Sequence, residues 1–426
     1  MDNSETPNLP APGNPAAPRC PRQAQRKAAM AARATSPRVV WADWHEEPFR
    51  CFFPVAVLAG IVGVALWPVV LSGWMTDYPG VRHARLMVQG FFGGFMIGFL
   101  GTAFPRFLEV RALRATEVFP LWFVFCGCIG AHALGATGLG DGLFIVTALA
   151  LAVILGGRLG QRMDVPPPGF VLVALGFAIG LAGLGLMTWA GSQEAAAGWE
   201  ALGRLWAYHC FVLLAILGAG GFLLPRFLGL SPRRKFATSV TGSPEWRRQA
   251  LLAAGTGLLV AGSYVLETAG WNRWAGLLRA ATVTGYLWNE MPLERLRWSG
   301  RGVQWILMFG LASIPLGILA AAWWPHVRVG LSHIELVSGF GLITVGVGTR
   351  VIFGHSGQRE QLERFHPWLT AAAVLMLLGM LSRVSGDFLP KSLASHYFSG
   401  ALCWLVGMLI WAACVLPKIL IADRER

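Results

Sequence analysis

The sequence predicts an all-α integral membrane protein with twelve transmembrane helices. Twelve apolar runs of about 20 residues follow one another, which is the length that crosses a bilayer. Only 13% of the 426 residues are charged, against about 25% in soluble domains. Lysine and arginine cluster in alternate loops, as the positive-inside rule requires. These three observations define the fold class.

The apolar runs divide the chain into a tail and one membrane domain. Residues 1–45 are basic and Pro-rich, lack an apolar core and predict a disordered cytoplasmic tail. Residues 46–426 form the twelve-span membrane domain. The expected spans are 53–73, 84–106, 118–138, 142–160, 169–191, 202–226, 249–269, 271–289, 303–324, 331–353, 367–384 and 395–420. The eighth is the weakest, because it carries Arg273 and Arg279.

Loop charge predicts that both termini are cytoplasmic. With the N-terminus inside, 27 of the 35 Lys and Arg residues fall in cytoplasmic regions. The first apolar run starts only at Phe52, so we expect a bacterial inner-membrane protein without a secretory signal. The same pattern accounts for the net charge of +13, which therefore does not indicate a nucleic-acid partner. The seven cysteines show no pairing framework.

An internal repeat relates the second and sixth spans. GFLGTAFPRFL (98–108) and GAGGFLLPRFL (218–228) match at six of eleven positions, at an offset of 120 residues. The tenth span lies four helices further on and is also Gly-rich. We therefore expect three related four-helix units. Gly90, Gly94 and Gly98 recur on one helix face, which permits close approach of either a neighbouring helix or a flat cofactor.

Histidines gather near the outer ends of the spans. An imidazole inside a bilayer is costly and usually faces the bundle interior. His83 opens the second span, His209 lies within the sixth and His333 opens the tenth. The pattern predicts that the three converge on one metal centre or cofactor. The alternatives are a headgroup contact for His83 and a hydrogen bond to a carbonyl for His209.

Two further histidines are candidate metal ligands. Cys128 and His132 share a helix face, which suits a soft metal or plain core packing. His355 follows Gly354 at the inner end of the tenth span, where it serves either a ligand or a helix cap. Glu335 could orient an imidazole or pair with Arg85 or Arg279. The residues expected around the ligands are Arg85, Tyr208, Glu335 and Arg350.

Four segments resemble the NnrS family of multi-span membrane proteins. They are FRCFFPVAVLAG (49–60), HARLM…GFLGTAFPRF (83–107), GGFLLPRFL (220–228) and SHIELVSGFGLITVGVGTRVIFGHSGQ (332–358). The resemblance implies a twelve-span protein that binds haem and copper and acts in bacterial nitric-oxide metabolism. The family pattern resembles H-A-H-E-M where this chain reads His83, Ala84, Arg85, Leu86 and Met87. A copper ligand at that missing histidine does not carry over, nor does the family's arginine at Phe222.

The layout is also similar to that of haem–copper oxidases, whose twelve helices form three arcs of four. Spans 2, 6 and 10 each carry a histidine here, and span 7 carries none. The hypothesis from the sequence is a haem b site with His83 and His333 as axial ligands and His209 near a second metal or an open position. The expected function is nitric-oxide metabolism or protection from nitrosative stress, with nitric oxide as the small-molecule ligand. The alternatives are a small-solute or metal transporter, and a non-catalytic assembly factor that delivers metal or haem.

Overall fold

The computed structural model describes residues 41–191, 193, 196–296 and 302–421. A short 3-10 helix, Trp41–Glu46, precedes the membrane helices. The helices are α2 (Phe49–Leu71), α3 (Gly80–Arg85), α4 (Gly93–Phe107), α5 (Ala115–Ala133), α6 (Thr137–Gly160), α7 (Phe170–Ala190), α8 (Ala197–Leu205), α9 (Phe211–Phe227), α10 (Pro244–Thr268), α11 (Asn272–Glu290), α12 (Gln304–Trp323), α13 (Arg328–His333), α14 (Leu342–His355), α15 (Pro367–Phe388) and α16 (Leu393–Val415). Short π-helical segments join α3 to α4 (Leu86–Phe92), α8 to α9 (Trp206–Cys210) and α13 to α14 (Ile334–Gly341).

The chain spans the membrane many times. Eleven helices of the described residues are long and apolar enough to cross a bilayer. The α11 helix is the twelfth and does not meet that criterion, because it carries Arg273 and the buried Arg279. It packs between α10 and α12. The twelve predicted spans are therefore all present as helices.

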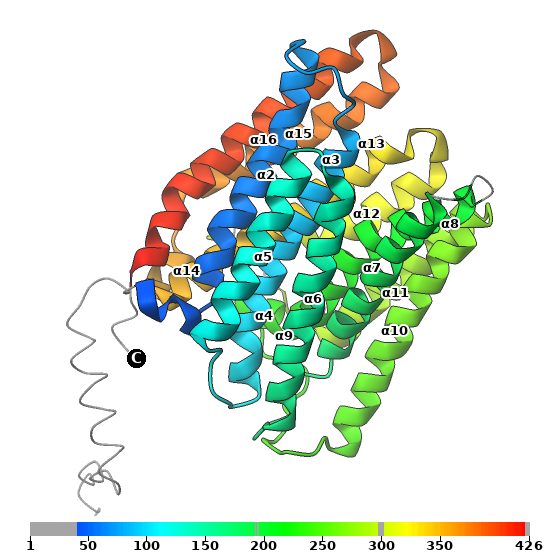
Figure 1. The fold of residues 1–426 in the computed structure, drawn as a ribbon. Coiled ribbons are helices and arrows are strands. Elements are labelled where there is room, and N and C mark those ends of the chain that lie inside the picture. Colours follow the sequence, from blue (N-terminus) through cyan, green and yellow to red (C-terminus); the bar gives the residue numbers. More distant parts are fainter. Residues whose placement is uncertain (1–40, 192, 194–195, 297–301, 422–426) are drawn as a thin grey trace, which may run out of the picture.

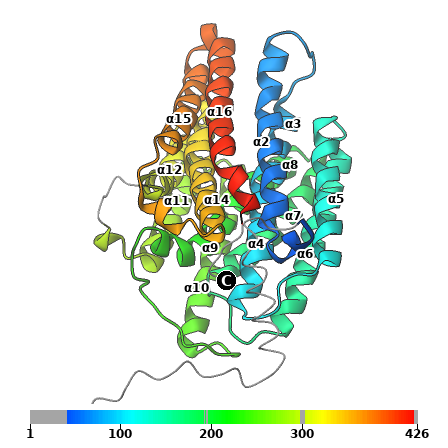
Figure 2. The same ribbon diagram turned by 90° about the vertical axis from the view of Figure 1, so that its left-hand side faces the viewer.

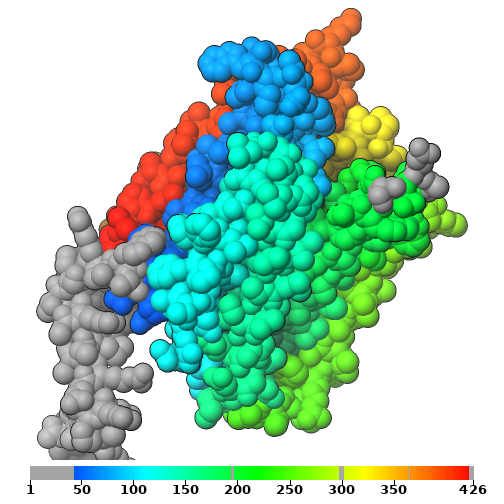
Figure 3. Space-filling view, in the orientation of Figure 1, coloured from blue at the N-terminus to red at the C-terminus, as the bar shows by residue number. Residues whose placement is uncertain are grey.

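The helices form three consecutive units of four. Unit 1 is α2 to α6, unit 2 is α7 to α11 and unit 3 is α12 to α16, running from blue to red in Figure 1. Units 2 and 3 meet through α11 and α12, and unit 3 returns to unit 1 through α16 and α2. Figure 2 shows this second pairing, and Figure 3 shows units 1 and 2 side by side on one face. The three units thus close around a common centre.

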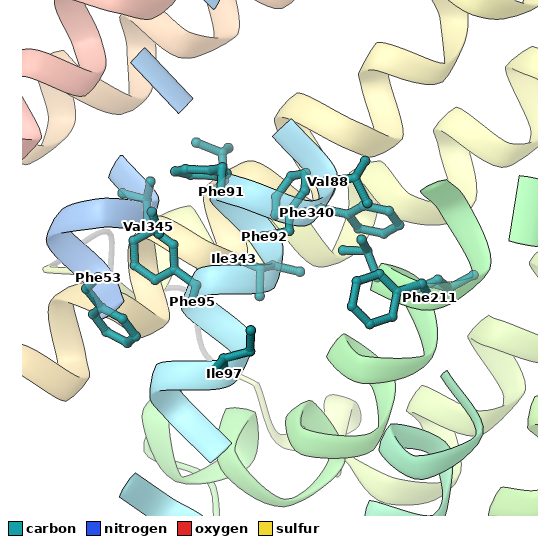
Figure 4. Packing of buried hydrophobic residues seen from close by; sticks show 14 of the residues in the cluster. Phe53, Val88, Phe91, Phe92, Phe95, Ile97, Phe211, Phe340, Ile343 and Val345 are labelled. Carbon is teal, nitrogen blue, oxygen red and sulfur yellow. The ribbon is translucent and has the colours of Figure 1, made fainter. Parts of the chain in front are cut away.

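The second span of each unit forms that centre. In the most apolar stretch of these spans, 78%, 67% and 72% of the residues are buried, against 33–44% in the other eight. Phe92 in the π-helical segment of unit 1 meets Phe340 of unit 3 with ring centroids 6.1 Å apart (Figure 4). Phe211 of unit 2 lies in the same cluster. The outer spans have lower burial because one of their faces is left for lipid.

The glycine face of α4 and its preceding π segment serves helix packing. A Cβ added at Gly90 or Gly94 would lie 2.7 Å from the Cβ of Ala59 or Ala56 on α2. One at Gly98 would lie 2.9 Å from the Cβ of Phe52. These glycines let α2 approach the central helix closely, which is the packing alternative rather than the cofactor alternative.

The structure extends the sequence repeat to all three units. The π-helical segments begin at residues 86, 206 and 334, and left-handed residues end the helices at 109, 229 and 357. The separation is 23 residues in every unit. A carbonyl five residues back accepts a hydrogen bond at each end, as in Val110 N–Pro105 O, Leu230 N–Pro225 O and Gln358 N–Phe353 O. This shared register supports three related four-helix units.

Glu109 is the one non-glycine residue among these three caps. Its φ of 54° is in the left-handed region, where Gly229 and Gly357 have 72° and 67°. Because an L side chain costs about 1–2 kcal/mol there, we expect Glu109→Gly to raise the free energy of unfolding by about 1 kcal/mol. Thermal unfolding of the purified protein measures this. The matched change Gly229→Ala should lower stability by a similar amount, and a destabilised Glu109→Gly would contradict the argument.

Candidate functional site

A large cavity lies where the three units meet, at the end of the bundle that carries most histidines. Its volume is about 1220 Å³, which exceeds the range of about 300–1,000 Å³ of ordinary small-molecule sites. Helices of all three units line it, and its deeper wall is apolar, with Phe91, Phe92, Val337 and Trp404. This cavity is the principal candidate site.

His83, His209 and His333 all line the cavity. In each, Nδ1 is already engaged: with Gly63 O at 3.0 Å, with Glu335 Oε2 at 3.0 Å and with Val329 O at 2.7 Å, respectively. Because the partner oxygens are acceptors, a ring that carries a single proton holds it on Nδ1, which leaves the lone pair of Nε2 available. An outer hydrogen bond of this kind is what ligating histidines ordinarily have.

The three imidazoles are spread around the wall. Among residues 41–421 that the structure describes, no three His, Cys, Asp or Glu side chains come close enough to hold one metal ion. The arrangement therefore fits a larger group that fills the space between the rings better than a single ion bound by all three.

The histidines do not occupy equivalent positions in the repeat. His83 lies three residues before its π-helical segment begins and His333 one residue before, whereas His209 lies three residues after. The position that matches His209 in unit 1, 120 residues earlier, is Gln89. π-helical turns are rare in proteins overall, but they occur often at functional sites. Each one shifts the following side chains around the helix. Each unit thus contributes one imidazole from a different register, which the sequence repeat did not reveal.

Glu335 pairs with His209 rather than with either arginine. The carboxylate is only 3% exposed, and its second oxygen, Oε1, has no protein partner. A small pocket of about 10 Å³ adjoins it and is lined by His209, Tyr264 and Glu335. Tyr264 Oη is likewise buried without a partner. The volume suits one water molecule, which could satisfy both groups.

A polar chain runs from the cavity wall into unit 1. Arg85 donates from Nε and Nη2 to Asp141 at 2.8–3.0 Å. Gln89 donates to Asp141 at 2.6 Å, and His132 Nε2 donates to the Gln89 carbonyl at 2.9 Å. His132 is fully buried and is not part of the cavity lining. His132 therefore orders Gln89, and Gln89 in turn orders Arg85 through their shared partner Asp141. Cys128 packs in the core beside Gln89.

Sequence reasoning missed Gln89 and Asp141. Their only signal is a polar side chain within an apolar run, and that signal does not reveal the partner. Tyr208, which the sequence did predict, lines the same cavity as Arg85.

Gly140 leaves room for the His132 ring at the end of this series of hydrogen-bonded side chains, because a Cβ there would lie 2.3 Å from the ring. We expect Gly140→Ala to lower the free energy of unfolding by about 1–3 kcal/mol, as overpacking does. Gly142→Ala on the same helix is the control, since nothing lies within 4 Å of its Cβ position. Thermal unfolding of both variants tests this. An equal effect at the two positions would contradict the packing argument.

His355 and Arg350 lie at the opposite end of unit 3. About 22 residues of helix separate His355 from His333, which corresponds to roughly 30 Å. His355 Nδ1 lies 2.6 Å from Glu47 Oε1, and Arg106 contacts both residues. Arg350 donates to Phe227 O at 2.8 Å. These two residues are not part of the cavity, and they tie the units together.

Glu47 is the centre of this second cluster. Burial alone would raise the pKa of its carboxyl, but the hydrogen bond and charge of His355, with Arg50 and Arg106, hold the pKa well below its usual range. Arg50 also donates to the backbone carbonyls of Ile419 and His355. The cluster therefore joins the N-terminal side of unit 1 to the last turns of unit 3.

Comparison with known proteins identifies the family. A search of curated proteins gives no match. The family model described as NnrS protein matches residues 43–424, which is nearly the whole chain and includes every residue of the cavity. The match accords with the segments that carry the resemblance in the sequence. The chain is a multi-span membrane protein of the NnrS family, a family related to nitric oxide.

Proposed function

We propose that the cavity binds haem b, which His83 and His333 would hold through their imidazoles, with His209 beside the bound group. The observation that carries the proposal is the set of three half-buried imidazoles around one cavity, each with Nδ1 engaged and Nε2 without a protein partner among the described residues. Imidazole is an ordinary ligand of haem iron. The cavity is also large enough for a porphyrin and apolar in its deeper part.

The proposed role is in nitric-oxide metabolism or protection from nitrosative stress. Bound haem would supply iron for nitric oxide to bind in place of one of the two imidazoles. The protein's own residues exclude water through Phe91, Phe92 and Trp404, and they hold the imidazoles through the Gly63, Val329 and Glu335 oxygens. Nitric oxide is small and apolar, so a cavity inside the apolar bundle is accessible to it. Family membership supports the link to nitric oxide.

Copper is not part of the proposal. The described residues offer no group of three His, Cys, Asp or Glu side chains that could hold it. Where the family pattern has a second histidine, Arg85 is held by Asp141 in a charge-assisted pair. A guanidinium cannot ligate a metal, because it is protonated at any ordinary pH.

We also propose that the protein lies in a bacterial inner membrane with both termini cytoplasmic. The loop between α9 and α10 carries Arg233, Arg234 and Lys235 at the end opposite the cavity, and positive loops stay on the cytoplasmic side. Exposed tryptophans, including Trp74, Trp189 and Trp271, mark helix ends on the cavity side. The cavity would then open near the periplasmic surface.

The visible absorption spectrum of the purified full-length protein, with porphyrin and metal analysis, tests the proposal. We expect a Soret band and bound iron, either after expression in haem-replete cells or after addition of hemin. A protein that stays colourless after both treatments would overturn the haem site. A colourless protein that retains metal would instead favour the metal-delivery alternative.

The transporter alternative predicts helices that are interrupted near the middle of the membrane. The second span of each unit instead stays helical through its π segment.

A further inference from the structure

Arg383, Asp387 and Tyr397 form a polar corner on the cavity wall that belongs to α15 and α16. Asp387 Oδ1 accepts a hydrogen bond from Arg383 Nη1 at 2.7 Å and another from Tyr397 Oη at 2.5 Å. The Arg383 guanidinium also lies over the Tyr397 ring, 3.9 Å from its centroid. Two contacts thus hold the guanidinium, and the Tyr397 hydroxyl in turn holds Asp387.

The surrounding helices are shaped around this corner. A Cβ at Gly330 of α13 would lie 2.4 Å from Asp387 Oδ2, and one at Gly386 would lie 3.0 Å from the Tyr397 ring. On its other side the Tyr397 ring packs edge-on against Trp67, with centroids 5.3 Å apart. The corner is therefore built by residues from units 1 and 3 together.

Arg383 uses few of its donors. A guanidinium carries five N–H groups, yet the protein residues described here accept only one hydrogen bond from Arg383, through Nη1. Arg85, on another part of the wall, donates from both Nε and Nη2 to Asp141. The Arg383 side chain is only 16% exposed, so little bulk water is available to its remaining donors, and the residue lines the cavity.

Arg383 also lies near the two proposed ligands. It interacts electrostatically with both His83 and His333. Trp67, which packs against Tyr397, also lies edge-on to the His83 ring with centroids 6.0 Å apart. A molecule that reaches both imidazoles therefore passes within reach of this guanidinium.

We propose that Arg383, fixed by Asp387 and Tyr397, binds a planar oxyanion of the molecule in the cavity. The unused N–H groups of a guanidinium match the two oxygens of such a group. The oxyanion is either a propionate of a bound porphyrin or a free anion such as nitrite. The first source rests on the proposed haem site, whereas the second does not. In both cases Arg383 is a binding residue that the sequence did not single out.

Two titrations distinguish the sources, on the full-length protein and its Arg383→Gln variant. The first compares the affinity for hemin with that for the dimethyl ester of hemin, which lacks the carboxylates. We expect wild type to prefer hemin by at least about tenfold and Arg383→Gln to show a ratio near one. The second follows tryptophan fluorescence during addition of sodium nitrite, against sodium chloride at equal ionic strength, because Trp67 and Trp404 line the cavity.

Arg204→Gln is the control variant. Arg204 lines the same cavity, but it is 50% exposed and paired with Glu200. The free anion is the ligand of Arg383 if nitrite binding is saturable, if only the Arg383→Gln variant loses it, and if wild type does not discriminate between hemin and its ester. If Arg383→Gln matches wild type in both titrations, the proposal is wrong. If no porphyrin binds at all, the haem site fails, and the nitrite titration alone decides the role of Arg383.

Discussion

Replacing His83 or His333 with alanine should lower haem occupancy of the purified protein by at least about tenfold. Loss of a mere hydrogen-bond partner of a ligand costs about 10–100-fold in affinity, and loss of the ligand itself should cost no less. Both rings line the cavity with Nδ1 anchored on a backbone carbonyl, so each offers only Nε2 to a bound group. Soret absorbance per protein, with porphyrin extraction, measures the occupancy.

His209→Ala should behave differently from these two variants. The ring is anchored on Glu335 rather than on a backbone oxygen, and we place it beside the bound group rather than on its iron. We therefore expect retained haem with a changed affinity for nitric oxide. His396→Ala is the matched control, because His396 lies at the same end of the bundle, contacts Ser382 and is not part of the cavity lining. Full occupancy in both the His83→Ala and His333→Ala variants would remove the ligand assignment.

The helices and their grouping could be predicted from the sequence because apolar length and loop charge are local properties. The twelve spans are present, and the similarity of residues 98–108 to 218–228 reflects matching π segments and left-handed caps. The span around residues 331–353 shares that register although its sequence has diverged. Backbone geometry therefore preserves the repeat better than the side chains do.

The partners of the polar residues could not be predicted, because they depend on helix rotation and depth. A π-helical turn changes both, and nothing in the sequence near Trp206 or Ile334 indicates one. The sequence therefore left several partners possible for Glu335, and in the structure its carboxylate pairs with His209. Arg383 and Asp387 are one helical turn apart and read as an ordinary surface pair, although both line the cavity.

Replacing Glu267 with glutamine should destabilise the bundle by about 3–5 kcal/mol. Glu267 is 9% exposed, accepts a hydrogen bond from Arg279 Nη2 at 2.6 Å and forms an ion pair with Arg328 Nη2 at 2.9 Å. Arg279 is 7% exposed and lies 3.4 Å above the Tyr264 ring. Removing one partner of a buried ion pair typically costs about 3–5 kcal/mol, because the other charge stays buried without compensation. Equilibrium unfolding in detergent should show a loss of that size.

The double variant Glu267→Gln/Arg279→Met separates this explanation from a loss of shape. If the uncompensated Arg279 charge causes the damage, its removal should restore part of the stability, so that the two changes are strongly non-additive. The exposed pair Arg204–Glu200 is the control, with side chains 50% and 38% exposed. Glu200→Gln should cost less than about 1 kcal/mol. Additive losses in the double variant would show that Glu267 contributes through packing. The ion pair with Arg279 would then not be the interaction that keeps α11 in place beside its more apolar neighbours.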